Sequence, residues 1–326
     1  MKRHSLPNTD LSVSSICYGV MRFGARVHGD DMFELYRVYC EAGGNFFDTA
    51  HSYACWYPNG EGCSERSLYE CMRKFGNRDD VVVSTKGALH AQGKVYPRPD
   101  DCMTPEVVAS DITDSLKRLQ IERIDLYTLH EDDTRHPVGE IIGMLNAEIT
   151  RGRVRYIGAS NWTAARLAEA DAYASAHQLQ GFVASSPQWN LGKPNHHPRA
   201  WDGTIDTTRY MMTDEDVAWY RKSKLAVMPW TPTGYGYFDG AVGQNPGSFD
   251  NPVSHARRER ARQLGQELGA TANQIALAYL MAYDFPVFPI QGTTNMAHLV
   301  DSLGADSFSL SPEQRDWLLT GDNPSA

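Results

Sequence analysis

Short apolar runs alternate along the chain with longer blocks whose apolar residues recur at helical spacing. The apolar runs, several of them rich in β-branched residues, predict buried strands at residues 15–20, 45–50, 81–86, 124–130, 154–160, 182–190, 225–231 and 287–291. The amphipathic blocks predict helices at residues 30–42, 64–75, 104–119, 138–151, 163–177, 214–223, 254–268, 271–283, 296–303 and 312–319. A short polar lead precedes the first predicted strand.

Every predicted strand is followed by a predicted helix, and no change in composition marks a second domain. Strict alternation of strand and helix is typical of a parallel sheet with helices on its outside. Eight such units in 326 residues predict an α/β fold, a (β/α)8 TIM barrel that forms a single domain over residues 1–326. A doubly wound open sheet is the structural alternative.

Two connections are longer than most loops in compact domains: residues 87–101 after the third strand and residues 192–213 after the sixth. In a barrel both lie on the C-terminal face, where loops build the active site. The second connection carries several polar and aromatic residues, namely Lys193, His196, His197, Arg199 and Trp201. We expect it either to contact the substrate or to form a solvated or subunit-contact surface, and we do not expect His196 and His197 to hold a metal.

The bulk composition narrows the classes of function. A net charge of −9 disfavours nucleic acid and membrane surfaces as partners. No apolar run approaches the about 20 residues that a membrane helix needs. The six cysteines form no C-x-x-C pair, which indicates reduced thiols in a cytoplasmic protein; a thiol role for Cys55 and Cys63 is the minor alternative. We expect a small-molecule substrate, and a homo-oligomer remains open.

Four residues that can carry acid–base chemistry stand at or just beyond the ends of successive predicted strands. Asp48 ends the second strand and Tyr53 follows it, Lys86 ends the third, and His130 ends the fourth. In a barrel these ends converge on one mouth. A buried Lys86 needs a counter-ion, which Asp48 supplies. Tyr has a reference pKa of about 10, and we expect the neighbouring Lys86 to lower it and make Tyr53 a proton donor.

The same residues also admit less specific interpretations. Asp48 and Lys86 alone could form an ordinary ion pair inside the barrel, and His130 alone could be a packed or surface histidine. A hydrolase or a Schiff-base lyase that uses Asp48 with Lys86 is a second chemical class. The joint placement of all four residues at successive strand ends favours a proton-donor site.

At this point the chain resembles the aldo-keto reductase family. The family places Asp, Tyr, Lys and His in this order on these strands, and Asp48-Thr49-Ala50-x-x-Tyr53 is similar to its opening motif. The stretches 43–50, 124–130 and 157–161 also resemble family segments, so that the likeness covers nearly the whole chain. The resemblance implies a (β/α)8 barrel and the reversible, NAD(P)H-dependent reduction of an aldehyde or ketone, with Asp48, Tyr53, Lys86 and His130 as catalytic residues.

The resemblance also implies a nicotinamide dinucleotide on the barrel mouth without a Rossmann fold, and no G-x-G-x-x-G stands between a strand and a helix. Ser160, Asn161 and Gln188 would bind the carboxamide, and Trp230 would stack on the nicotinamide unless it is a rim-packing residue. Thr231, Thr233 and Gly234 would line the pyrophosphate. The adenosine end would be bound by Gly292, Thr293, Thr294, His298, Asp301 and Ser302.

The resemblance favours NADP(H) over NAD(H), because family members commonly grip the 2′-phosphate with Lys or Arg near the adenosine end. This chain has no Lys or Arg between Phe285 and Pro312. NAD(H) is therefore the alternative cofactor.

The substrate pocket is predicted to include Phe23, His51, Tyr57, Tyr235 and Tyr237, together with the long loops. Their polar and aromatic groups favour a hydroxylated or anionic aldehyde, such as a sugar-derived one. Some family barrels are subunits of membrane complexes, so the resemblance leaves a non-catalytic or regulatory role as the alternative.

Overall fold

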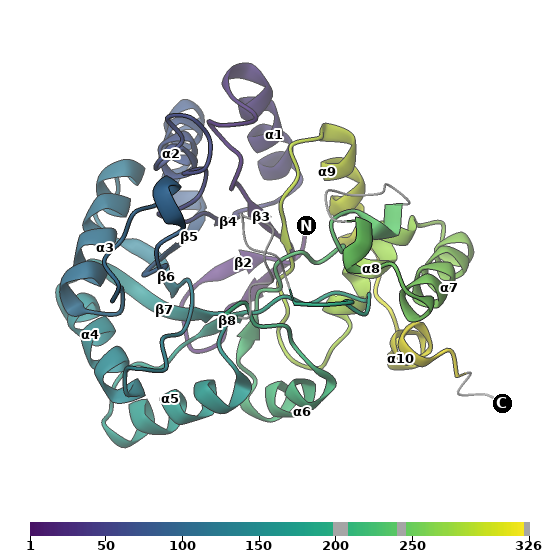
Figure 1. Ribbon diagram of the computed structural model, residues 1–326. Coiled ribbons are helices and arrows are strands. Elements are labelled where there is room, and N and C mark those ends of the chain that lie inside the picture. The colour runs from purple at the N-terminus through teal and green to yellow at the C-terminus, as the bar shows by residue number, and fades with distance from the viewer. Residues whose placement is uncertain (198–207, 240–245, 323–326) are drawn as a thin grey trace.

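The computed structural model describes residues 1–197, 208–239 and 246–322, and Figure 1 shows its strands surrounded by helices. Eight strands pair in parallel in the order β10-β3-β4-β5-β6-β7-β8-β9. Their bounds are β3 (Cys17–Gly19), β4 (Phe46–Asp48), β5 (Val82–Gly87), β6 (Ile124–Leu129), β7 (Val154–Ser160), β8 (Ala184–Ser186), β9 (Ala226–Val227) and β10 (Ile290–Gln291). The order follows the chain, as the alternation of elements predicts.

The sheet closes on itself. Parallel bridges join Val227 to Val287 and Trp230 to Ile290, which links the two outer members of the strand order. The Phe288 amide donates to the Val227 carbonyl at 2.8 Å across this seam. The molecule is therefore a (β/α)8 barrel, as predicted, and the open doubly wound sheet is wrong.

The ten predicted helices are all present, with small shifts at their ends. Their bounds are α1 (Gly29–Glu41), α2 (Cys63–Phe75), α3 (Pro105–Leu119), α4 (Val138–Thr150), α5 (Ala164–Ala176), α6 (Asp214–Ser223), α7 (Pro252–Leu268), α8 (Ala272–Met281), α9 (Met296–Leu303) and α10 (Pro312–Thr320). The Thr104 hydroxyl caps α3 by accepting from the Val107 amide at 3.3 Å. Gly76 and Gly269 end α2 and α7 with φ values of 63° and 67°, a conformation that glycine adopts without strain.

Most of the strands are shorter than the hydrophobic runs predict, and the difference is largest for β8 and β9. β8 ends before Pro187, and β9 is followed within two residues by Pro229. Proline has no amide proton for the ladder, so regular pairing stops at these positions. A parallel bridge then joins Gln188 to Trp230 and keeps the segments after β8 and β9 side by side toward the mouth.

The polar lead of the chain forms an antiparallel hairpin, which the sequence pattern did not predict. Its strands are β1 (Arg3–Ser5) and β2 (Ser12–Ser14), each too short for a clear alternation. Leu6, Leu11 and Val13 are buried in one cluster with barrel-interior residues such as Phe46 and Leu126. The hairpin therefore closes the end of the barrel from which the strands start, opposite the mouth.

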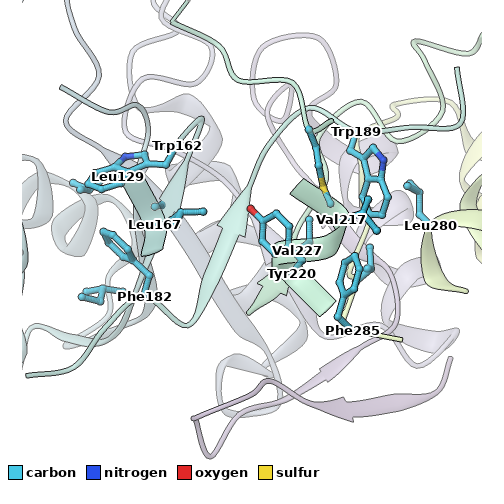
Figure 2. Packing of buried hydrophobic residues seen from close by; sticks show 14 of the residues in the cluster. Leu129, Trp162, Leu167, Phe182, Trp189, Val217, Tyr220, Val227, Leu280 and Phe285 are labelled. Carbon is cyan, nitrogen blue, oxygen red and sulfur yellow. The ribbon is translucent and has the colours of Figure 1, made fainter. Parts of the chain in front are cut away.

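A second apolar layer fills the space between the strands and the helices around them. Figure 2 shows part of it, with Leu129, Trp162, Leu167 and Phe182 at one side and Trp189, Val217 and Phe285 at the other. The rings of Trp162 and Phe182 meet edge to face with centroids 5.1 Å apart, an arrangement that aromatic pairs favour. This packing fixes the positions of the strand ends that carry the site.

Candidate active site

Asp48 and Lys86 form a buried ion pair at the ends of neighbouring strands. Asp48 ends β4 and pairs in register with Ser84, two residues before Lys86 on β5. The Lys86 ammonium lies 2.5 Å from both oxygens of the Asp48 carboxylate and donates to the Thr49 carbonyl at 3.2 Å. The two side chains are only 3% and 2% exposed, so each charge depends on the other for compensation.

Tyr53 lies against this pair. The Lys86 ammonium is 3.0 Å from the Tyr53 hydroxyl and 4.7 Å from the centre of its ring. Burial by itself lowers the pKa of Lys86, but Asp48 and the phenol outweigh burial and hold the pKa of Lys86 above its ordinary value. Lys86 is therefore a permanent cation beside the phenol.

The pKa of Tyr53 lies above its ordinary value, because burial raises it by more than the Lys86 ammonium lowers it. The expectation of a lowered pKa is wrong in its net direction, although the ammonium acts in the expected sense. The sequence predicted Lys86 as the neighbour of Tyr53, but it could not predict the burial that raises the pKa of the phenol. A phenol in this state keeps its proton at neutral pH, as a proton donor must.

His130 directly follows β6 and faces the same group of side chains. Its ring meets the Tyr53 ring edge to face with centroids 5.5 Å apart, and its Nδ1 lies 3.4 Å from the Ser52 hydroxyl. Burial, followed by the cations Lys86 and Arg209, lowers the pKa of His130 well below its ordinary value. The imidazole is therefore neutral and can hold a polar ligand by a hydrogen bond.

The structure thus brings together the four residues predicted to be catalytic. It also adds groups that the sequence analysis missed. The Ser84 hydroxyl donates to Asp48 at 3.4 Å, and Ser52 contacts His130. Arg209 lies near enough to lower the pKa of both Tyr53 and His130. Serine and arginine are common in strands and loops alike, so no sequence signal set these three apart.

Asn161 ties together the neighbouring strand ends. Its side-chain amide donates to the His130 carbonyl at 2.9 Å, and its oxygen accepts from the Trp230 indole and from the Tyr210 amide, both at 3.2 Å. The Ser160 hydroxyl at the end of β7 donates to the Ser186 carbonyl at 2.8 Å. These polar groups line the rim beside His130, next to the buried Gln188.

The segment after Trp230 forms a tight turn. Thr231, Gly234, Tyr235 and Gly236 all have positive φ values, between 56° and 84°. The Thr231 carbonyl accepts from the Gly234 amide at 3.1 Å and from the Asn190 side chain at 3.2 Å. Thr233 is buried in the same turn. Successive turns of this kind can present backbone amides to an anion.

The segment after β10 is only in part available to a ligand. Gly292 and His298 are exposed, and Thr293 and Thr294 are half-buried. Ser302 is fully buried, and its hydroxyl accepts from the Gln291 and Asn273 side chains at 2.7 and 3.1 Å. The predicted contact of Ser302 with a cofactor therefore receives no support from this geometry, because its hydroxyl is enclosed by Asn273 and Gln291.

Asp301 is held in the same contact between α8 and α9. Its carboxylate accepts from the Thr271 hydroxyl at 2.9 Å and from the Asn273 side chain at 2.8 Å. Its hydrogen bonds therefore point toward α8, and its predicted contact with a cofactor receives no support from this geometry.

Three of the residues predicted for the substrate pocket point elsewhere. Phe23 is 1% exposed and packs edge to face on Tyr18, with centroids 5.7 Å apart. His51 is buried, with its Nε2 3.2 Å from Asp114 on α3 and its Nδ1 2.7 Å from the Tyr96 hydroxyl. Tyr237 turns toward α7, with Arg258 4.6 Å from its ring centre. In each case the neighbours along the chain suggested the mouth, whereas contacts with other side chains hold the residue elsewhere.

Two predicted pocket residues remain accessible. Tyr57 is half-buried beside Trp56, with ring centroids 6.0 Å apart. Tyr235 is half-buried, and its ring centroid lies 6.3 Å from that of Phe249. Both stand on loops that follow barrel strands on the C-terminal face.

The long connection after β8 is described only in part. Arg199 and Trp201 lie outside the described residues. The Lys193 amide donates to the Ser254 hydroxyl at 2.9 Å, and the His196 ring contacts the neighbouring His197 carbonyl at 2.5 Å. The start of this connection is thus anchored to the first turn of α7.

Comparisons with known proteins agree with this arrangement. The model of the Aldo/keto reductase family matches residues 15–318. An aryl-alcohol dehydrogenase [NADP(+)] of Phanerodontia chrysosporium is 29% identical, over 97% of this chain and 84% of its own. A probable voltage-gated potassium channel subunit beta of Oryza sativa subsp. japonica is 27% identical, over 94% and 91%.

A solved structure shares the fold. It is that of the thermostable aldo-keto reductase Tm1743 in complex with the inhibitor epalrestat, with a TM-score of 0.71, 20% identity, and coverage of 98% of this chain and 99% of that one. The family match spans the strand ends that carry Asp48, Lys86 and His130. The chain therefore belongs to the aldo/keto reductase family of oxidoreductases.

Proposed function

We propose that the protein is an NAD(P)H-dependent enzyme that reversibly reduces an aldehyde or ketone to the alcohol. One observation carries the proposal: the Lys86 ammonium lies 2.5 Å from the Asp48 carboxylate and 3.0 Å from the Tyr53 hydroxyl. This contact keeps a cation beside a half-buried phenol and stabilises the phenolate that is left when the proton is given away. Asp48 stabilises the charge on Lys86 and fixes its direction.

The rim of the barrel offers groups that fit a nicotinamide dinucleotide. Gln188 is 5% exposed, and its side-chain amide makes no hydrogen bond to another residue in the described part of the chain. A carboxamide, which both donates and accepts, suits this amide together with Ser160. The half-buried Trp230 ring can stack on the nicotinamide, and the turn from Thr231 to Gly236 can receive the phosphates. A bound nicotinamide supplies the hydride of the reaction.

The residues of the chain supply the proton and the orientation. Tyr53 donates its hydroxyl proton to the carbonyl oxygen as negative charge develops there, and Lys86 stabilises the resulting phenolate. The neutral His130 imidazole can donate a hydrogen bond to the same oxygen from Nε2, with Nδ1 accepting from Ser52. In the reverse direction the phenolate accepts the alcohol proton.

The preferred cofactor is proposed to be NADP(H), as the name of the fungal relative indicates for that protein. NAD(H) is the alternative, because residues 286–311 offer no Lys or Arg to bind a 2′-phosphate. Asp239 lies close enough to Asp301 for the two carboxyl groups to interact through their charges, so this region holds two acidic groups. Carboxylates disfavour a 2′-phosphate. Fluorescence titration with both reduced cofactors tests this: binding of NADH at least as tight as that of NADPH refutes the NADP(H) preference.

The substrate is proposed to be a polar, sugar-derived carbonyl compound. Tyr57 and Tyr235 offer phenols at the mouth, and Arg209 and His130 add nitrogen donors next to Tyr53. Several donors around one opening suit hydroxyl or carboxylate groups better than an aliphatic chain. Aryl aldehydes are the comparison class, since one relative is named an aryl-alcohol dehydrogenase.

A Schiff-base lyase that uses Lys86 is disfavoured by the same ion pair. Schiff-base formation needs the free amine, whereas Asp48 holds the pKa of Lys86 above its ordinary value. A regulatory role remains as the second candidate, because the rice relative is named a potassium channel subunit. No described helix has the length and apolar character needed to cross a membrane.

We further propose a cytoplasmic location, which the six free cysteines support. Size-exclusion chromatography with light scattering measures the molar mass in solution and so tests for a homo-oligomer.

The test is a Tyr53→Phe substitution assayed against a panel of sugar-derived and aryl aldehydes. Without its proton donor the enzyme should lose nearly all turnover, measured as loss of reduced-nicotinamide absorbance, while fluorescence titration shows unchanged cofactor affinity. The control is Tyr220→Phe, which removes a buried hydroxyl on α6 that donates to Ser185 at 2.8 Å. Full turnover by the Tyr53 variant, or no carbonyl reduction by the wild type, refutes the proposed function.

A further inference from the structure

A group of polar side chains, three of them buried, lies beside the loop that carries Tyr53. We call it the His51 cluster and define it as His51, Tyr96, Arg98, Asp111 and Asp114. His51 Nδ1 lies 2.7 Å from the Tyr96 hydroxyl, and its Nε2 lies 3.2 Å from Asp114 and 3.8 Å from Asp111. His51, Tyr96 and Asp111 are 4%, 4% and 1% exposed.

The cluster joins three segments that are far apart in the chain. His51 belongs to the loop after β4, two residues before Tyr53, whereas Tyr96 and Arg98 belong to the loop after β5, which starts next to Lys86. Asp111 is on α3, where it accepts from both terminal nitrogens of Arg98 at 2.7 Å. It also accepts from the Ala88 amide at 2.8 Å, two residues after Lys86.

The backbone of His51 is held as firmly as its side chain. Its amide donates to the Lys86 carbonyl at 2.8 Å, and its carbonyl accepts from Arg118 at 3.0 Å. Arg118 in turn contacts Glu65, a fully buried carboxylate on α2, at 3.2 Å. The residues that follow, Ser52 and Tyr53, then face His130 and Lys86.

Burying a charged network of this kind brings little net stability compared with apolar packing. Buried ionic groups instead restrict the structure to one geometry. Proton transfer needs such restriction, because a displacement of about 1 Å at a reacting group can cost about 100-fold in rate. The loop that carries Tyr53 is built from local turns, in which the Tyr53 amide donates to the Ala50 carbonyl at 3.1 Å, and the contacts of His51 join these turns to the neighbouring loop.

We propose that His51 and Tyr96 are positioning residues, which hold the Tyr53 hydroxyl against the Lys86 ammonium by tying the two loops together. The inference rests on the proposed function. Neither side chain reaches the mouth, and both act through the backbone that leads into Tyr53.

The test compares Tyr96→Phe with Tyr220→Phe, since each removes one hydroxyl of a buried tyrosine and one hydrogen bond. Tyr96→Phe should lower kcat about tenfold or more, with KM and cofactor affinity within about twofold of wild type. Tyr220→Phe should keep the wild-type kcat at a similar melting temperature. His51→Gln retains a donor and an acceptor and should keep more turnover than His51→Leu, which retains neither.

A readout that depends on the Tyr53–Lys86 contact separates positioning from plain structural support. If Tyr53 moves away from the ammonium, its pKa rises, so the alkaline limb of kcat/KM for reduction shifts to higher pH in Tyr96→Phe. Carbon-13 NMR of labelled tyrosine follows the same titration without turnover. An unchanged Tyr53 titration in a folded Tyr96→Phe variant overturns the inference. Absence of carbonyl reduction in wild type and Tyr220→Phe overturns the proposed function instead, and the NMR titration still decides on the positioning.

Discussion

At the scale of single residues, the site depends on two buried charges that compensate each other. Lys86 is 3% exposed and Asp48 is 2% exposed, yet both are fully hydrogen-bonded at the ends of adjacent strands. The residue types and their order were predictable from the chain, because a buried lysine at a strand end requires a carboxylate nearby. Their distances, and the burial that raises the pKa of Tyr53, required the closed barrel.

The first prediction concerns the counter-ion. Asp48→Asn leaves Lys86 as an uncompensated buried cation, so the free energy of unfolding should fall by about 3–5 kcal/mol, measured by urea denaturation. The control is Asp284→Asn, which breaks the exposed pair with Arg221 (3.0 Å) and should cost no more than about 1 kcal/mol. Equal losses in the two variants would contradict the assignment of a buried, mutually dependent pair.

The second prediction concerns pH. Burial, followed by Lys86 and Arg209, holds the pKa of His130 well below its ordinary value, so the folded state resists protonation while the unfolded state accepts it below about pH 6.5. The unfolded state then binds more protons, and stability falls as pH drops through that value. In His130→Asn the free energy of unfolding should therefore fall less steeply with decreasing pH, by up to about 1.4 kcal/mol per pH unit.

Urea denaturation of wild type and His130→Asn at a series of pH values between about 7 and 5 measures this difference. The other titratable groups are the same in both proteins, so their contributions to the pH dependence cancel in the comparison. Parallel pH dependences would show that His130 is protonated in the folded state.

At the scale of elements, the sequence predicts where helices begin and end, but it does not predict the contacts between helices. Thr104 caps α3 and Gly269 ends α7, as local rules predict. Ser302 and Asp301 matched a family segment, but α9 packs on α8 so that their side chains join the two helices. A sequence motif shows which residues share one face of a helix, but only the packing of that helix shows what this face contacts.

The third prediction tests this assignment. Ser302→Ala removes the acceptor of the Gln291 and Asn273 side chains, both in buried positions, and should lower the free energy of unfolding by about 1–3 kcal/mol. Affinity for the nicotinamide cofactor should stay close to wild type. Thr294→Ala, at a half-buried position on the same segment, serves as the matched variant and should leave stability within about 0.5 kcal/mol. Weaker cofactor binding by Ser302→Ala at unchanged stability would reverse our conclusion.

At the scale of the whole molecule, the barrel separates stability from chemistry. The hairpin of β1 and β2 closes the end where the strands begin, with Leu6 fully buried among barrel-interior residues. The polar site lies at the other end, where the strands finish. Because the two ends are separate, the mouth can hold buried charges while apolar burial at the closed end stabilises the fold.

The fourth prediction follows from this division. Leu6→Ala should lower the free energy of unfolding by about 2–5 kcal/mol, because a buried leucine leaves a cavity that its neighbours only partly fill. The kcat of the folded variant should equal that of wild type, since the hairpin is remote from Tyr53. A large fall in kcat at full stability would show that the closed end influences the site.

The sequence by itself determined the barrel, its helices and the four residues of the proposed catalytic group. These features depend on local periodicity, helix caps and the order of strand ends, all of which are carried by short stretches of chain. Only the tertiary structure decided which side chains face the mouth. His51 and Tyr53 are two residues apart, yet one joins a buried network behind the loop and the other meets Lys86. The cause is that a loop's side chains take their directions from distant partners, here Tyr96 and Arg118, which no local pattern can place.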